Sequence, residues 1–336
     1  MKAKLTLMAL TMATGLMAQG VLDVHSHLIT PEYRAVLEQH GMQLDEGFPL
    51  PAWSVEQHLM DMNTIGIATS VITMPAPQPY FGDVEEAKRI IRQNNEAAAT
   101  LKAQYKARFL FCASLPLPDV NAAIEEAVYA LDSLDANGIK LSTNVYGQYL
   151  GDPALDPLME VLNERSAVII LHPCKPSPYN DDLMKGVPLA MSEYLAETTR
   201  AVSNMITHNV LSRYPNLRVV VPHCGAYLPL AIPRMKSIHP AVQNAGLVGD
   251  IDWDTQLSRL YYDLAGAVSI PTIKMMLTIT EPSHLLYGSD YPYVAADVLK
   301  RKLGILRMDL LNDEELAPYV DDIFGKNFLK LLRNEQ

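Results

Sequence analysis

The sequence predicts an α/β protein that folds as a single (β/α)8 TIM barrel, and three observations support this prediction. Short runs rich in β-branched residues alternate with longer helical patterns along the chain. Several of these short runs are continuously apolar, as in Val168–Leu171 and Val219–Val221, which is typical of strands buried on both faces. Metal-ligand and acid/base residue types stand at the ends of the runs, where barrels of this kind form their active sites.

Eight runs are predicted to be the barrel strands. They cover Val21–His27, Ala68–Met74, Phe109–Leu115, Gly138–Ser142, Ala167–His172, Leu217–His223, Leu260–Leu264 and His284–Asp290. The amphipathic patterns between them predict helices over Ser54–Ile65, Val84–Lys106, Asn121–Leu134, Leu155–Glu164 and Glu193–Ser212, the first with Ser54 as its N-cap. No glycine-rich phosphate loop follows the first run, which disfavours a doubly wound open sheet.

Length and composition agree with one barrel. The chain has 336 residues, of which 49% are hydrophobic and 19% charged, so a large buried core is expected. The net charge of −11 argues against a nucleic-acid partner, because an acidic surface repels phosphate backbones. It does not argue against a small carboxylic acid substrate, because a metal ion or an arginine dominates the field of its own pocket.

The N-terminal segment 1–18 has the layout of a signal peptide. Lys2 and Lys4 precede the apolar run Leu5–Met17, and Ala18 offers a cleavage point. This run is too short to span a bilayer, and no other stretch of the sequence predicts a membrane span. We therefore expect an exported, periplasmic protein whose barrel domain covers 19–336. The alternatives are an uncleaved extension, or a start at Met17 that leaves the protein in the cytoplasm.

A metal site is predicted at the carboxyl ends of the strands. His25 and His27 end the first strand two residues apart, so both side chains can point to the same side. His172, His223 and Asp290 end three further strands. Each of these residues alone is as compatible with a buried histidine or a helix cap as with a ligand. Their gathering at one face of the barrel is what favours a metal, and imidazole with carboxylate suits Zn²⁺, Mn²⁺ or Fe²⁺.

The same segments carry a resemblance to a known family. The motifs are Asp23-Val24-His25-Ser26-His27, His172-Pro173, Pro222-His223-Cys224-Gly225 and Gly288-Ser289-Asp290-Tyr291-Pro292. They resemble the amidohydrolase superfamily, and within it the branch of non-oxidative decarboxylases that act on aminocarboxymuconate semialdehyde, γ-resorcylate and 6-methylsalicylate. The sequence is most similar to the 6-methylsalicylate decarboxylases, over roughly Val21–Tyr293.

The resemblance implies a fold, a site and a reaction. It implies a barrel of the metal-dependent hydrolase type in which His25, His27, His172 and Asp290 bind one divalent ion. We expect this ion to be Zn²⁺, although the same ligands accept Mn²⁺. His223 would be the acid/base residue, and Asp290 our candidate proton donor to carbon. The reaction would release CO2 from an ortho-hydroxy aromatic acid resembling 6-methylsalicylate, or from a related enol or muconate acid. A homodimer or larger assembly is also implied.

A metal-dependent hydrolase is the alternative. There a metal-activated water would attack an amide, ester or lactone. Lys140, near the end of the fourth strand, keeps this reading open, because binuclear amidohydrolases carry a carboxylated lysine there; with His223 it could complete a second metal site. The other reading of Lys140 is a substrate-binding lysine at the barrel mouth. A metal-storing or sugar-binding barrel is a third hypothesis, disfavoured because His223 stands in addition to a full ligand set.

Substrate-binding residues are less clearly marked by the sequence. Arg200 is a candidate carboxylate clamp, because guanidinium matches a carboxylate with two hydrogen bonds. Trp53 is a candidate for stacking on an aromatic ring, and the alternative is that it packs beneath its loop. The long segment Lys175–Ser192 follows a ligand-bearing strand and is expected to form a lid or a wall of the substrate site.

Overall fold

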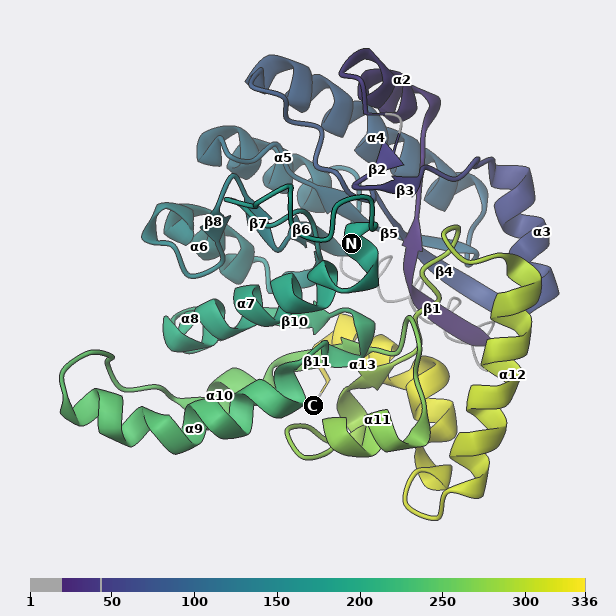
Figure 1. Cartoon of the computed structure of the whole chain (residues 1–336). Helices are drawn as coiled ribbons and strands as arrows, with labels where there is room; N and C mark the ends of the chain where they lie inside the picture. The colour runs from purple at the N-terminus through teal and green to yellow at the C-terminus, as the bar shows by residue number, and fades with distance from the viewer. Residues whose placement is uncertain (1–19, 43, 336) are drawn as a thin grey trace, which may run out of the picture.

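Eight parallel strands form a barrel with helices around its outside (Figure 1). The structure is a computed structural model that describes residues 20–42 and 44–335, so the expected signal peptide lies outside the described residues. Neighbouring strands follow one another in chain order. They are β1 (Val21–His27), β4 (Ile67–Thr73), β5 (Phe109–Ser114), β6 (Gly138–Ser142), β9 (Val168–His172), β10 (Arg218–Val221), β11 (Leu260–Asp263) and β12 (Leu285–Leu286).

The barrel closes through the segment that follows the short strand β12. The backbone N–H of Val24 donates to the carbonyl of Tyr287 at 2.9 Å, and that of His27 donates to Tyr291 at 2.8 Å. In the opposite direction, the N–H of Asp290 donates to the carbonyl of His25 at 2.8 Å. These bonds join the first and last strands of the sheet. The barrel predicted from the sequence is therefore confirmed, and its seam lies beside the candidate metal ligands.

Helices cover the outside of the barrel. They are α2 (Pro31–Gln39), α3 (Val55–Ile65), α4 (Val84–Gln104), α5 (Val120–Asp132), α6 (Asp156–Glu164), α7 (Glu193–Thr207), α8 (Val210–Arg213), α9 (Leu228–Asn244), α10 (Trp253–Ser258), α11 (Ile270–Met276), α12 (Ala296–Asn312) and α13 (Asn327–Arg333). The predicted cap of α3 is confirmed, because the Ser54 hydroxyl accepts a hydrogen bond from the N–H of Gln57. Helix α12 packs against α3, so the helical layer also closes (Figure 1).

Three predicted boundaries were wrong. The helix expected over Glu193–Ser212 is two helices, α7 and α8, because Asn209 between them has a left-handed backbone (φ 51°). The Asn209 side chain is tied to the turn before α10, donating to the carbonyl of Asp250 and accepting from the N–H of Asp252. The sixth and eighth strands end at Val221 and Leu286, so His223 and Asp290 lie on the loops that follow.

Two short hairpins that the sequence analysis did not predict stand among the loops of the barrel. They are β2–β3 (Leu44–Asp45 and Phe48–Pro49) and β7–β8 (Asn144–Val145 and Gln148–Tyr149). The N–H of Leu189 donates to the carbonyl of Glu46, which ties the first hairpin to the long segment after β9. Two loops distant in sequence thus lie side by side.

The core has two main parts. The larger one fills the space between the strands and the surrounding helices. The smaller one is the barrel interior, where side chains from opposite strands meet, including Leu22, Val71, Val168 and Val220. Phe328 of α13 packs into this interior cluster. Apolar packing therefore fills the part of the barrel toward the amino ends of the strands, and polar side chains gather at their carboxyl ends. No helix in 20–42 and 44–335 is long and apolar enough to cross a bilayer.

Candidate metal centre and its cavity

Four residues predicted from the sequence as metal ligands come together at the barrel mouth. One donor atom from each of His25, His27, His172 and Asp290 lies within 4.8 Å of those of the other three. The three histidines are buried, and Asp290 is 24% exposed. They come from β1, β9 and the loop after β12, segments that only the barrel brings together.

The two histidines of β1 reach this point because of a shift in strand register. Between Asp23 and Ser26 the pairing of β1 with β4 is irregular, with one more residue on β1 than on β4. Before the shift, Leu22 and Val24 belong to the interior apolar cluster. After it, His25 and His27 are the residues that face the candidate metal centre. The even-numbered residues Leu22 and Val24 thus point inward before the shift, and the odd-numbered His25 and His27 point inward after it.

Each histidine uses its Nδ1 atom for a hydrogen bond within the protein. His25 Nδ1 lies 2.8 Å from Asp263 Oδ2, and His172 Nδ1 lies 2.8 Å from the carbonyl of Pro173. Both partners only accept, so Nδ1 carries the proton. His27 Nδ1 lies 3.2 Å from the Thr73 hydroxyl, which donates to the carbonyl of Ser26 and so accepts from the ring. In the neutral form of each ring, Nε2 is therefore the atom with the lone pair that binds a metal.

The electrostatics of this cluster suit a cation. Burial lowers the pKa of His27 to about 4 and that of His172 well below its usual value, so both rings are neutral at pH 7. Burial also opposes protonation of His25, but Asp263 and Asp290 outweigh it and raise the pKa of His25 to about 9. The same two carboxylates would favour a metal ion in place of that proton. The buried Nε2 of His25 makes no hydrogen bond in the described structure, so the donor set fits a divalent ion.

Asp290 is held by a network beneath its own loop. Its backbone is in the left-handed region (φ 63°), and the preceding Ser289 donates from its N–H and its hydroxyl to the buried carboxylate of Asp23, at 2.9 and 2.6 Å. Burial alone would raise the pKa of Asp290. The adjacent His223 and His27 rings, with the positive charge at His25, hold that pKa well below its usual range. Asp290 is thus ionised and ready to bind a cation.

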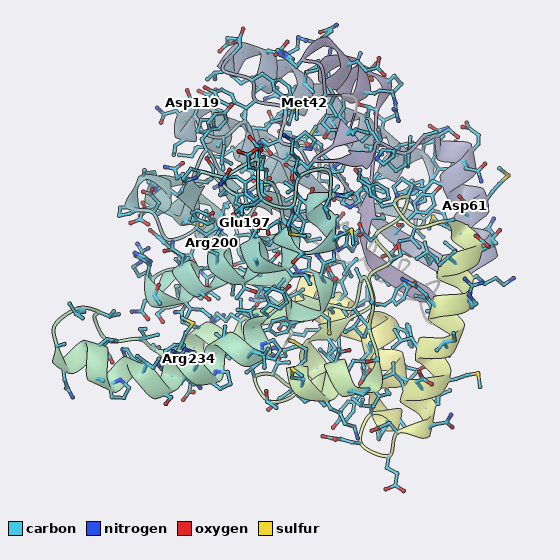
Figure 2. All side chains as sticks on the ribbon, viewed as in Figure 1. Met42, Asp61, Asp119, Glu197, Arg200 and Arg234 are labelled. Atoms are coloured by element: carbon cyan, nitrogen blue, oxygen red, sulfur yellow. The ribbon has the colours of Figure 1, made fainter. Side chains whose placement is uncertain are left out.

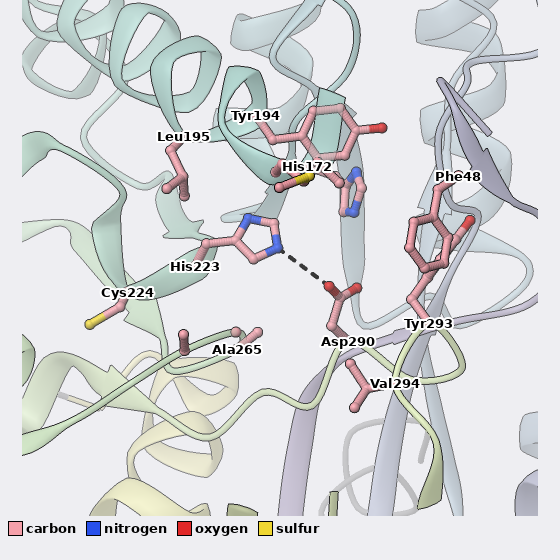
Figure 3. A pocket seen from close by; sticks show the side chains of 14 residues that line it. Phe48, His172, Tyr194, Leu195, His223, Cys224, Ala265, Asp290, Tyr293 and Val294 are labelled. Carbon is pink, nitrogen blue, oxygen red and sulfur yellow. Dashed lines mark ion pairs between the residues drawn. The ribbon is translucent and has the colours of Figure 1, made fainter. Parts of the chain in front are cut away.

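His223 faces Asp290 from the loop after β10. Its Nε2 lies 3.6 Å from Asp290 Oδ2 (Figure 3), and its backbone also has a positive φ of 55°. The N–H of His223 donates to Asp263 Oδ1 at 3.0 Å, while Asp263 Oδ2 accepts from His25. One fully buried carboxylate therefore positions a candidate metal ligand and the candidate acid/base residue together. The sequence analysis assigned Asp263 no role, although it is an acidic residue at the end of an apolar strand.

We expect Asp263→Asn to weaken metal binding about 10- to 100-fold, because the variant loses the carboxylate that orients His25 and stabilises the metal-loaded imidazole. The measurement is a competition titration with a chelator of known affinity. Asp119→Asn is the matched control, since Asp119 caps α5, is not one of the four donors, and asparagine caps equally well. Equal affinities in Asp263→Asn and the control would contradict the role given to Asp263.

A cavity of about 390 Å³ opens over these residues. His172, His223 and Asp290 supply its imidazole and carboxylate side chains, and the remaining walls are apolar or aromatic apart from the thiol of Cys224 (Figure 3). They are Phe48, Ala190, Met191, Tyr194, Leu195, Cys224, Ala265, Gly266, Ala267, Tyr293 and Val294. Ala190 and Met191 come from the long segment after β9, which was expected to form a wall. Among the described lining residues, none is lysine or arginine.

The three candidate substrate-binding residues do not line this cavity. Arg200, half-exposed on α7, is paired with Glu197 of the same helix (Figure 2). Trp53 donates from Nε1 to His58 Nδ1 at 3.1 Å and packs on the outer core. Lys140 lies inside the barrel, where it is 1% exposed and donates from Nζ to the Ser142 hydroxyl at 3.1 Å. Its charge helps to lower the pKa of His27. Lys140 therefore lies near the candidate metal centre without lining the cavity.

The contact of Trp53 with His58 leads to a pH prediction. Burial, with the nearby charges of Arg108 and His27, lowers the pKa of His58 to about 3. In the unfolded chain the same histidine has a pKa of about 6.5. Between about pH 6.5 and pH 3 the unfolded state therefore binds one proton more than the folded state, and the free energy of unfolding falls as the pH is lowered. We expect His58 to account for a loss of about 2 kcal/mol between pH 7 and pH 5.

Urea unfolding of the wild type and of His58→Gln at both pH values measures this contribution. Glutamine does not titrate and can still accept from Trp53, so its loss of stability on acidification should be smaller by about 2 kcal/mol. Equal losses in the two proteins would contradict the prediction.

Comparisons with known proteins agree with this geometry. A family model described as amidohydrolase matches residues 22–333. A 6-methylsalicylic acid decarboxylase of Aspergillus aculeatus is 32% identical over 310 residues, covering 90% of this chain and 91% of the relative. A crystal structure described as an amidohydrolase II superposes with a TM-score of 0.85 at 29% identity, over 93% of this chain and 99% of that one.

A further structural comparison concerns the fold alone. A 5-carboxyvanillate decarboxylase from Novosphingobium aromaticivorans, crystallised with manganese and 4-hydroxy-3-methoxy-5-nitrobenzoic acid, superposes with a TM-score of 0.81 at 20% identity. The match covers 95% of this chain and 97% of that one.

The barrel and its cluster of three histidines and a carboxylate define a metal-dependent (β/α)8-barrel enzyme. Within that class, the chain belongs to the amidohydrolase family. The curated relatives that it matches along most of its length are decarboxylases by name, so the enzyme is a carboxy-lyase and the hydrolase alternative is not supported.

Proposed function

We propose that this enzyme releases CO2 from an ortho-hydroxy aromatic monocarboxylic acid resembling 6-methylsalicylate. The observation that carries the proposal is the cavity, whose floor is the histidine–carboxylate centre and whose walls are apolar or aromatic. A muconate-type acid would bring a second carboxylate into contact with walls that include no lysine or arginine among the described residues. A substituted benzene ring fits those walls, and the relative from A. aculeatus has such a substrate in its name.

The roles of the residues follow from their positions. His25, His27, His172 and Asp290 would hold the divalent ion, which when bound supplies Lewis-acid stabilisation of developing oxyanion charge. Asp290 would deliver the proton to the ring carbon that bears the carboxyl group. Because Asp290 is ionised at rest, His223 Nε2, 3.6 Å from its Oδ2, would supply that proton. Return of aromaticity then accompanies the departure of CO2.

We propose Zn²⁺ as the ion, with Mn²⁺ as the alternative. A set of three imidazole nitrogens and one carboxylate oxygen is common for zinc, and the same donors accept manganese. The related 5-carboxyvanillate decarboxylase was crystallised with manganese, which supports the alternative. Activity regained by the chelated enzyme with each ion separately would decide between them.

Export and assembly are further proposals from the sequence. Residues 1–18 would direct the chain to the periplasm, leaving the barrel domain 19–336, and the mature enzyme would be a homodimer or larger. Sequencing of the mature N-terminus from fractionated cells and light scattering on the purified enzyme test these two points. An intact Met1 in the cytoplasmic fraction, or a monomer, would contradict them.

The function itself is tested by measuring metal content and CO2 release on purified enzyme. The substrates are salicylate, 6-methylsalicylate and 2,6-dihydroxybenzoate, with an ester, a lactone and an amide as the hydrolase panel. We expect about one metal per chain and CO2 release that is lost on chelation and restored by metal. Two metals per chain with hydrolysis alone, sensitive to Lys140→Met, would overturn the proposal.

A further inference from the structure

The cavity is larger than a methyl-substituted benzoate requires. An apolar cavity of about 150 Å³ is enough to bind benzene. The cavity over the candidate metal centre measures about 390 Å³, so a ring with a carboxyl, a hydroxyl and a methyl group leaves much of it unfilled. The chemistry of the unfilled part then indicates what else the substrate carries.

The two sides of the cavity differ in character. On one side the exposed ring of Phe48 meets Tyr293 edge to face with centroids 5.9 Å apart, and Tyr293 meets His27 in the same way at 5.5 Å. This side offers aromatic surfaces next to the metal ligands, which suits the substrate ring. On the other side His223 enters the cavity, with Leu195 above it and Ala265 below it in the view of Figure 3.

We call this second side the alkyl branch, formed by Leu195, Cys224, Ala265, Gly266 and Ala267. Leu195 and the two alanines present only carbon atoms, and Gly266 has no side chain. Burial raises the pKa of the Cys224 thiol to about 12, so this side chain stays neutral. Beside His223, the side chains of the branch therefore offer a ligand no charged group and only a weakly polar sulfur.

The space behind the branch is mostly apolar. Gly266 and Ala267 border a second cavity of about 120 Å³ on the other side of their loop, lined by Leu264, Val268, Leu299, Leu303 and Leu306 among others. Lys302, which also lines it, donates to the carbonyl of Gly266 at 3.3 Å. A chain in the branch thus lies against a loop that is itself backed by leucines. Water in such a branch would find few hydrogen-bond partners, and an apolar group displaces such water favourably.

We propose that the alkyl branch binds an alkyl chain on the substrate ring, so that the preferred substrates are ortho-hydroxybenzoates with a chain of several carbons rather than a methyl group. This inference rests on the proposed decarboxylase function and names its substrate class. Each methylene that the branch buries should strengthen binding by up to about fourfold.

The test compares 6-methylsalicylate with 6-pentylsalicylate on the metal-loaded enzyme, by kcat/KM for CO2 release and by calorimetric binding. We expect kcat/KM for the pentyl acid to be about tenfold higher or more. Leu195→Trp should fill the branch and bring this ratio to one or below. Leu247→Trp is the matched control, because Leu247 is 75% exposed and lies outside the cavity lining, and its ratio should equal that of the wild type. Should Leu195→Trp fail to fold, Ala267→Leu at the exposed end of the branch replaces it.

The two measurements separate this inference from the proposed function. CO2 release from 6-methylsalicylate with no preference for the pentyl acid, or a preference that Leu195→Trp leaves unchanged, overturns the alkyl branch and leaves the decarboxylase intact. No CO2 from either acid, but tighter binding of the pentyl acid that Leu195→Trp removes, overturns the decarboxylase and supports the branch. If neither binding nor turnover depends on the length of the alkyl chain, the alkyl branch is overturned, whether or not the enzyme releases CO2.

Discussion

Asp290→Asn is expected to lower kcat for CO2 release by about 10⁴-fold, the largest effect of any single change considered. Acid/base catalysis by a positioned group contributes about 10²- to 10⁴-fold, and this residue also supplies the one carboxylate of the candidate metal centre. Asparagine has nearly the same shape but no negative charge and no proton to deliver at pH 7. The measurement is single-turnover CO2 release with the metal content of each sample determined.

The control is Asp297→Asn, an exposed carboxylate in the first turn of α12 that does not line the cavity. It should retain full activity. Thermal unfolding of both variants checks that the loop after β12 still folds. Activity within tenfold of the wild type in Asp290→Asn would mean that neither the ligand role nor the proton role belongs to this residue.

His223→Asn is expected to lower kcat by about 10²- to 10⁴-fold while the metal content stays near that of the wild type. His223 lies outside the group of four donors and reaches the centre through Asp290, so its loss should remove proton delivery without removing a ligand. The shape of the pH profile of kcat should also change, because the group that resupplies the proton is absent.

His208→Asn serves as the matched control, because His208 is an exposed residue at the end of α7 with no contact to the cavity. We expect unchanged kcat and metal content there. If His223→Asn loses metal in proportion to its activity, then His223 is a ligand, and the proton path from His223 to Asp290 is wrong.

The sequence by itself determined the barrel and the membership of its candidate centre. Apolar runs buried on both faces, such as Val168–Leu171, have few stable environments other than a parallel sheet covered by helices. Histidine and aspartate at the carboxyl ends of such runs then meet at one face, whatever the details of the loops. For this reason the sequence grouped His25, His27, His172, His223 and Asp290, and the resemblance separated the four candidate ligands from His223.

The tertiary structure decided the points that depend on segments distant in the sequence. The irregular pairing of β1 with β4 turns His25 and His27 inward after Leu22 and Val24 have already faced the interior, and no local pattern marks such a shift. The role of Asp263 depends on its reaching both His25 and the backbone of His223. An isolated aspartate in a strand gives no sign of such partners.

The substrate side depended on the structure most of all. Arg200 has the right chemistry for a carboxylate, but helix geometry places Glu197 one turn away, and the two charges pair with each other. The cavity walls instead come from the β2–β3 hairpin, the segment before α7, the first turn of α7, and the loops after β10, β11 and β12. Loop conformation is set by contacts made after the barrel has closed, so the sequence determined the chemistry at the strand ends, and only packing decided what surrounds it.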